Sequence, residues 1–127
     1  WTTSMGRVLL SVLADEEIRQ LYGTTRIIAA ATERTKTSLD DVIAELARVR
    51  QDGWCLVDQE LEWGLRSVAV PVMRSGRVFA ALNVATANVA ESPVETRERV
   101  LPALLATAAT ISEILQATPP HLHPVVG

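Results

Sequence analysis

The sequence predicts an α+β domain in which helices pack on an antiparallel sheet. Apolar residues first recur at helical spacing, as far as Gly53. A pattern with a period of two, typical of strands, then runs from Trp54 to Thr86. Helical spacing returns after Ser92. Helices, then consecutive strands, then a helix is the order of an α+β domain rather than of alternating strands and helices.

Composition sets the broad class of protein. The chain has 127 residues, 48% of them hydrophobic and 21% charged, which suits one folded domain with a sizeable core. Its net charge of −3 argues against a nucleic-acid-binding surface in this segment, though not against a basic domain elsewhere. The single cysteine, Cys55, excludes an internal disulfide and fits a reducing cytoplasm. No apolar run approaches membrane-spanning length, and the chain, which begins with Trp1, is interpreted as a fragment.

Two short helices are predicted near the N-terminus. The first starts at a cap formed by Thr3 or Ser4. The second covers residues 16–22, with Asp15 as its cap and Gly23 as its stop. The apolar face of the first helix is expected to comprise Met5, Val8, Leu9, Val12 and Leu13.

A third helix is predicted from its N-cap Ser38 to Gly53, with acidic residues in its first turn. Its apolar stripe comprises Leu39, Val42, Ile43 and Leu46. Residues 23–37, before this helix, have no clear period and are expected to form mostly loop. A strand at 26–31 is an alternative, because the strands visible elsewhere are few for a sheet.

Three strands follow, at 54–59, 65–73 and 77–86. The last two form a hairpin if residues 74–76 are its loop, which places Met73 opposite Arg77 and Ser67 opposite Asn83. One face of this hairpin must be buried, and it comprises Val68, Val70, Val72, Val78, Ala80, Leu82 and Val84. The other face is small and mildly polar, and it comprises Ser67, Ala69, Asn83 and Ala85.

A long helix is predicted over residues 93–117, with Ser92 as its N-cap and Pro93 at its first position. Pro102 either kinks this helix or marks a later start. Its stripe comprises Val100, Leu104, Ala108, Ile111 and Leu115. The tail at 119–127 is expected to be loosely held.

Two features are candidates for ligand binding. The hydroxyl run that ends at Ser4 lies where the unpaired N–H groups of a helix start can hold an anion, although such a run is more often only a cap. Asn83 stands in a strand of small residues, where an amide is unusual and costly to bury unpaired. It is interpreted as a ligand contact, with a satisfied structural amide as the alternative.

The charged residues of the strand region are assigned structural roles. Arg66 is expected to form an ion pair with Glu60 or Glu62, although it could also clamp a carboxylate. Asp58, Glu60 and Glu62 alternate as an exposed strand face would. Since no base or substrate partner accompanies them, catalysis is not predicted.

Other reactive or aromatic residues carry weaker signals. Cys55 is interpreted as a buried thiol rather than a nucleophile. His121 and His123 lie in a proline-rich tail that offers no further ligands, so no metal is assigned. Trp63 either lines a cleft or subunit contact or packs in the core.

Four segments carry a family resemblance. They are TSMGRVLL at 3–10, VRQDGWCLVDQELEWGLRSVAVPV at 49–72, GRVFAALNVA at 76–85 and LPALLATAATIS at 101–112. In this order they resemble the effector-binding domain of IclR-type bacterial transcriptional regulators. The sequences of these segments are most similar to the subgroup that controls aromatic-acid breakdown through the β-ketoadipate pathway.

The resemblance implies a curved antiparallel sheet flanked by helices, similar to GAF and profilin domains, here without its first strands. Residues 1–118 would form the effector-binding domain and 119–127 a flexible tail. Such proteins are not enzymes and bind DNA through an N-terminal winged helix-turn-helix, which this segment does not contain. A cytoplasmic homodimer or homotetramer is expected, with a small organic acid as effector, no cofactor and no membrane partner.

In the family, the effector lies in a cleft at the start of the TSMGR helix, above the sheet. The matching positions here are Thr3, Ser4, Met5, Gly6, Val57, Asp58, Ser67, Asn83 and Ala85. Some relatives carry an acid in place of Val57 and hydroxyls in place of Asn83 and Ala85, so the ligand need not be a two- or three-carbon keto acid. The rival interpretation is a ligand-free oligomerisation module, whose small hairpin face packs against another subunit.

Overall fold

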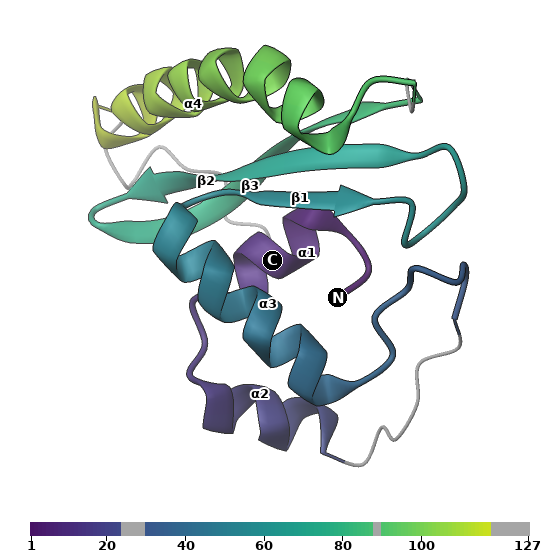
Figure 1. Ribbon diagram of the computed structural model, residues 1–127. Coiled ribbons are helices and arrows are strands. Elements are labelled where there is room, and N and C mark those ends of the chain that lie inside the picture. Colours follow the sequence, from purple (N-terminus) through teal and green to yellow (C-terminus); the bar gives the residue numbers. More distant parts are fainter. Residues whose placement is uncertain (24–29, 88–89, 118–127) are drawn as a thin grey trace, which may run out of the picture.

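A three-stranded antiparallel sheet lies between two groups of helices (Figure 1). This computed structural model describes residues 1–23, 30–87 and 90–117. The elements in chain order are α1 (Ser4–Leu10), α2 (Asp15–Tyr22), α3 (Leu39–Asp52), β1 (Cys55–Asp58), β2 (Arg66–Arg74), β3 (Arg77–Thr86) and α4 (Pro93–Ala117). The predicted α+β class is confirmed. α4 covers one face of the sheet, α1 and the end of α3 cover the other, and α2 packs against α3.

The two faces of the sheet carry separate clusters of buried side chains. Toward α4, the valines of β2 pack on one stripe of the helix; this cluster comprises Val68, Val70, Val72, Val100, Leu104 and Ala108. On the opposite face, Val8 of α1 and Val49 of α3 meet small residues of the strands, Cys55, Val57 and Ala69. The alternation of β2 between these clusters confirms the predicted sorting of its side chains.

The hairpin between β2 and β3 is tighter than predicted. Its loop has two residues, Ser75 and Gly76, both with positive φ (52° and 75°), and Arg74 pairs with Arg77. A two-residue loop with both residues at positive φ follows the right-handed twist of the strands, which favours it over a three-residue loop. The predicted pairing of Met73 with Arg77 is therefore wrong.

A bulge between Val72 and Met73 shifts the remaining pairs. Ser67 lies opposite Ala85 rather than Asn83, which lies opposite Ala69. Because the net shift from the predicted register is two residues, the side chains beyond the bulge stay on their predicted faces.

Val78, before the bulge, does not keep its predicted face. It pairs with Met73 and lines a hollow with Pro71 and Val8 on the α1 side of the sheet. The assignment of Val78 to the valine face was therefore wrong.

α1 departs from its predicted amphipathic pattern. It ends at Leu10, and its buried residues are Ser4, Arg7 and Val8, whereas Met5 and Leu9 are exposed. Thr3 is the N-cap, and its hydroxyl accepts from the Gly6 N–H at 3.0 Å. A buried arginine on this helix was not predicted.

The start of α2 also differs slightly from the prediction. Asp15 is its first residue rather than its cap, and the Glu17 carboxylate accepts from the Ala14 N–H at 3.2 Å. The predicted strand at 26–31 lies mostly outside the described residues, as does the whole tail at 119–127.

α3 and α4 match their predicted limits. The Ser38 hydroxyl caps α3, and Gly53 ends it at φ 76°, a conformation that favours glycine. α4 begins with a reciprocal cap between Ser92 and Glu95 and continues through Pro102. By length and hydropathy alone, α4 is the one helix of the described residues that could cross a bilayer, so the expectation that no apolar run approaches that length was wrong. Here one stripe of α4 packs on the sheet.

Candidate functional site

A pocket of about 110 Å³ opens at the start of α1, on the face of the sheet opposite α4. Its lining residues are Thr2, Thr3, Ser4, Met5, Val57, Leu61, Leu65, Ser67, Asn83 and Ala85. All nine predicted positions except Gly6 and Asp58 are among them. No charged side chain lines the pocket within the described part of the chain.

Gly6 and Asp58 are turned to other partners. The Gly6 N–H already donates to the cap at Thr3. The Asp58 carboxylate accepts from Arg66 Nε at 2.9 Å and from Arg34. Both residues have partners within the chain, and neither is among the lining residues of the pocket.

The floor of the pocket is a row of residues across the three strands. Val57 lies opposite Ser67, and Ser67 lies opposite Ala85. Asn83 is two pairs further along, diagonal to Ser67, so the two polar side chains are neighbours on this face. The floor therefore combines small residues with one hydroxyl and one amide.

Ser4 is the unusual residue of the wall formed by α1. Its side chain is 1% exposed, and its hydroxyl is the only buried side-chain polar atom without a hydrogen-bond partner in residues 1–23, 30–87 and 90–117. A buried group of this kind costs about 1–3 kcal/mol. The N–H groups of Ser4 and Met5 precede the first intrahelical hydrogen bonds. This end of the pocket can therefore donate to an anionic oxygen.

Sequence analysis missed Thr2, Leu61 and Leu65 as lining residues. Thr2 belongs to the hydroxyl run before α1, which was a usable signal. Leu61 and Leu65 lie in the connection between β1 and β2, here called the β1–β2 loop (residues 59–65). Leu65 was expected as the first residue of a strand, which in the structure begins at Arg66.

A buried ion pair lies behind the pocket. Arg7 Nη1 and Nη2 donate to the two carboxylate oxygens of Glu60, each at 2.7 Å. Both residues are buried, so the predicted exposed position of Glu60 was wrong. β1 ends at Asp58, and the chain turns at Gln59, which has a φ of 57° and redirects the next side chain inward.

The pair keeps both groups ionised. Burial alone would raise the pKa of the Glu60 carboxyl, but the hydrogen bonds and charge of Arg7 and the backbone N–H of Lys36 outweigh it. The pKa of Glu60 is therefore lowered. Burial alone would lower the pKa of Arg7, because it disfavours the charged form. The hydrogen bonds and the charge of Glu60 outweigh burial, so the pKa of Arg7 is raised.

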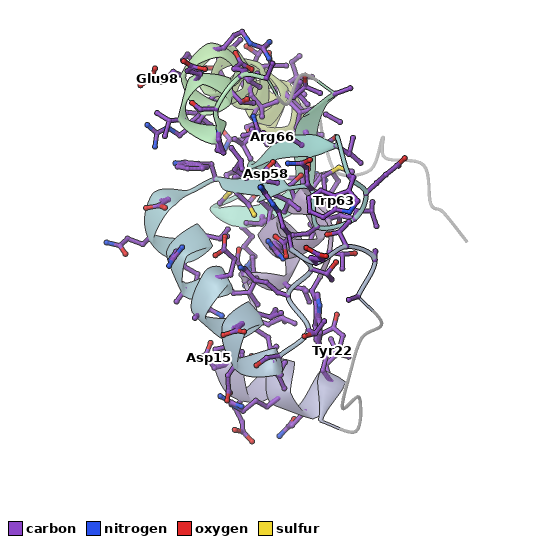
Figure 2. The ribbon with its side chains drawn as sticks, turned by 45° about the vertical axis from the view of Figure 1, so that its right-hand side comes forward. Asp15, Tyr22, Asp58, Trp63, Arg66 and Glu98 are labelled. Atoms are coloured by element: carbon purple, nitrogen blue, oxygen red, sulfur yellow. The ribbon has the colours of Figure 1, made fainter. Side chains whose placement is uncertain are left out.

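Arg66 forms an ion pair, as predicted, but with Asp58 instead of Glu60 or Glu62 (Figure 2). Its Nη1 also donates to the Glu91 carbonyl at 2.7 Å and to the Thr96 hydroxyl at 2.9 Å, near the start of α4. Through these hydrogen bonds the guanidinium joins β1 to the start of α4, which is a structural role rather than the binding of a ligand carboxylate.

The remaining candidates show no reactive site. Cys55 is buried, as predicted, and burial raises the pKa of its thiol to about 12. Trp63 is exposed, with the Arg34 guanidinium over its ring, and does not line the pocket (Figure 2). Within the described part of the chain, no group of three or more His, Cys, Asp or Glu side chains could hold a metal ion.

A wider groove of about 350 Å³ lies between β3 and α4. It is open and almost entirely apolar; Asn83 and Thr107 are its only polar lining residues. The smaller pocket is the better candidate for recognition of a polar ligand, because polar groups converge in it.

Residues 1–113 match the family model of the bacterial transcriptional regulator IclR C-terminal domain. The chain belongs to the IclR family. It is 45% identical over 109 residues to the Pca regulon regulatory protein of Pseudomonas putida, covering 85% of this chain and 37% of that protein. It is 36% identical over 118 residues to the p-hydroxybenzoate hydroxylase transcriptional activator of Acinetobacter baylyi, covering 89% and 42%. This IclR-family chain thus spans less than half the length of these curated relatives, which are named as regulators, not enzymes.

Solved structures agree with this IclR assignment. A putative transcriptional regulator from Rhodococcus superposes with a TM-score of 0.83 at 41% identity, covering 91% of this chain and 46% of that one. The inducer-binding domain of PobR from Acinetobacter, solved as a double mutant with 3-hydroxybenzoic acid, superposes with a TM-score of 0.82 at 33% identity. That match covers 89% of this chain and 65% of the PobR domain.

Proposed function

We propose that this chain senses a small organic acid of aromatic catabolism, such as β-ketoadipate or protocatechuate, for an IclR-type regulator. The observation that carries the proposal is the buried, unpartnered hydroxyl of Ser4, a residue of the pocket that lies where the family resemblance implies an effector site. The names of two relatives support the chemical class, since one refers to the Pca regulon and the other to p-hydroxybenzoate hydroxylase.

The pocket suggests how such an acid would bind. A carboxylate oxygen would accept from the Ser4 hydroxyl and from N–H groups of the first turn of α1. Ser67 and Asn83 would pair with the other polar groups of the acid. Leu61 and Leu65 would contact its apolar part.

Regulation would follow from unequal affinity. An acid shifts a regulator between two subunit arrangements only if it binds them with different strength. In this proposal residues 1–118 form the sensing domain of a cytoplasmic homodimer or homotetramer. DNA is bound by a winged helix-turn-helix that precedes this segment in the full-length protein.

The decisive experiment measures the thermal unfolding of the full-length protein against a panel of acids: β-ketoadipate, protocatechuate, 4-hydroxybenzoate, pyruvate and glyoxylate. An acid that binds only the native state must raise the unfolding temperature in a saturable way. A shift with one of the first three supports the proposal. If none of the five produces a shift, the pocket does not serve these acids, and the ligand-free oligomerisation module becomes the better interpretation.

Asn83→Ala is expected to weaken binding of the active acid about fivefold, because the acid loses a hydrogen bond worth about 1 kcal/mol. Titration calorimetry gives the affinity. Gln51→Ala is the matched control, since Gln51 is an exposed amide on α3, away from the pocket. Equal affinities for Asn83→Ala and the wild type would remove Asn83 from the site.

Ser4→Ala is expected to weaken binding of the acid without destabilising the free protein. The free protein loses an unsatisfied buried hydroxyl, so its free energy of unfolding should stay constant or rise by about 1 kcal/mol. Affinity for the acid should fall about tenfold, because the hydroxyl is lost as a donor. Chemical denaturation and calorimetry measure the two quantities. A less stable free protein would show that the hydroxyl has a structural partner.

A further inference from the structure

The two walls of the pocket are joined from behind by one side-chain pair. α1 supplies Ser4 and Met5 to the pocket, and the β1–β2 loop supplies Leu61 and Leu65 from the opposite side. Arg7 follows Ser4 by one turn on the buried side of α1, and Glu60 immediately precedes Leu61. The Arg7–Glu60 pair thus bridges two elements that are 53 residues apart in sequence.

The geometry of the pair leaves little freedom. Two parallel hydrogen bonds of 2.7 Å fix the separation and the rotation of the guanidinium relative to the carboxylate. Arg7 Nε also donates to the Trp1 carbonyl at 2.8 Å, and the Lys36 N–H donates to Glu60 at 3.0 Å. The guanidinium and the carboxylate therefore each have one further hydrogen-bond partner, from the backbone of Trp1 and of Lys36.

The rest of the β1–β2 loop is fastened around this pair. The Thr35 hydroxyl donates to the Glu60 carbonyl, and the Thr32 hydroxyl donates to the Gln59 carbonyl. Across the loop, the Gln59 N–H donates to the Leu65 carbonyl at 2.8 Å. The Gly64 N–H donates to the Gln59 side chain at 3.0 Å.

We propose that Arg7 and Glu60 are positioning residues that set the distance between α1 and the β1–β2 loop, and thereby the affinity of the pocket for its acid. This inference rests on the proposed function. A buried ion pair is no better a source of stability than a well-packed apolar pair of similar size, because desolvation offsets the attraction. What an apolar pair lacks is a fixed separation and orientation. Neither residue touches the acid; both act through the walls that they join.

The test replaces the pair without leaving a buried charge. In the full-length protein, the double variant R7M/E60L is expected to keep the unfolding temperature of the wild type and to bind the active acid at least tenfold more weakly. The control R19M/D40L removes an exposed ion pair between α2 and α3 and should bind normally. Wild-type affinity in a folded R7M/E60L variant would overturn the proposal. A double variant that does not fold would also count against it, because the pair would then be needed for stability.

A second variant keeps the charge and changes only the geometry. Arg7→Lys retains a cation beside Glu60 but cannot form the parallel pair of hydrogen bonds. It is expected to fold and to bind the acid several-fold more weakly. Affinity equal to that of the wild type would show that charge, and not separation, is what Arg7 supplies.

Hydrogen exchange separates this inference from the proposed function. The amides of Gly64 and Leu65 are hydrogen-bonded within the loop, and they should exchange at least tenfold faster in R7M/E60L than in the control. If the wild type binds none of the acids, the proposed function fails, and faster exchange would still support positioning. Unchanged exchange would overturn the inference whether or not an acid binds.

Discussion

Glu60→Ala is expected to lower the free energy of unfolding by about 3–5 kcal/mol, because it leaves Arg7 as a buried and unpaired cation. This is a large part of the 5–15 kcal/mol that stabilises a typical domain. Urea unfolding at pH 7 measures the change. Glu62→Ala, two residues away at an exposed position, is the control and should change stability by about 0.5 kcal/mol at most. A loss below about 1 kcal/mol for Glu60→Ala would mean that water reaches Arg7.

The effect of this substitution should depend on pH. Because the pKa of Glu60 is lowered in the folded protein, its contribution to stability is complete above the pKa of an unfolded glutamate, about 4.3. It is lost as the pH falls through the lower pKa of the folded state. The stability difference between wild type and Glu60→Ala should therefore be largest at neutral pH and shrink in acid. A difference that is constant from pH 7 to pH 3 would show that the charge of Glu60 is not what stabilises Arg7.

Local signals in the sequence predicted the longer elements well. The Ser38 cap and Gly53 bound α3, and the Ser92 cap with Pro93 starts α4, because each of these residues acts on the backbone next to it. The alternation along β2 and β3 sorted most side chains to the correct face for the same reason.

Features that depend on distant contacts could not be predicted in this way. The hairpin register depended on a bulge, which leaves no mark in a period-two pattern. Glu60 was expected on an exposed face and Arg7 was given no role, since nothing in either local sequence shows that they meet. Met5 and Leu9 were wrongly expected on the buried face of α1 for the same reason. The burial of Arg7 turns another side of the helix toward the sheet, and Met5 and Leu9 are exposed.

The candidate site was found by two independent routes. The strand period placed Ser67 and Asn83 on one face, and the family resemblance supplied the residues at the start of α1. The structure brings both groups around one pocket. Leu61 was missed because an irregular loop carries no period from which a face could be read. Leu65 stands two residues before Ser67 at the start of the predicted strand, so the period of two could have placed it on the same face.

A third buried cluster, between α2 and α3, yields the other large prediction. It comprises Ile18, Val42, Ile43 and Leu46 and is separate from the two clusters on the sheet. Leu46 is fully buried, so Leu46→Ala is expected to lower the free energy of unfolding by about 2–5 kcal/mol through lost burial and a residual cavity. Leu21→Ala on α2, where the side chain is 60% exposed, is the matched control and should cost about 1 kcal/mol at most.

The same variant tests whether the helical cluster and the sheet unfold together. Trp1 packs on this cluster, with its ring 4.8 Å from that of Tyr22, and its indole N–H donates to the Lys36 carbonyl at 3.0 Å. Trp1 directly precedes Thr2 of the pocket, and its carbonyl accepts from Arg7, which ties the cluster to the sheet side. In Leu46→Ala protein whose other tryptophans, Trp54 and Trp63, are replaced by phenylalanine, we therefore expect the unfolding midpoints by tryptophan fluorescence and by circular dichroism to coincide. A fluorescence transition that precedes the loss of secondary structure would show that α2 and α3 separate first, and that the hydrogen bond between Arg7 and the Trp1 carbonyl does not couple them to the sheet.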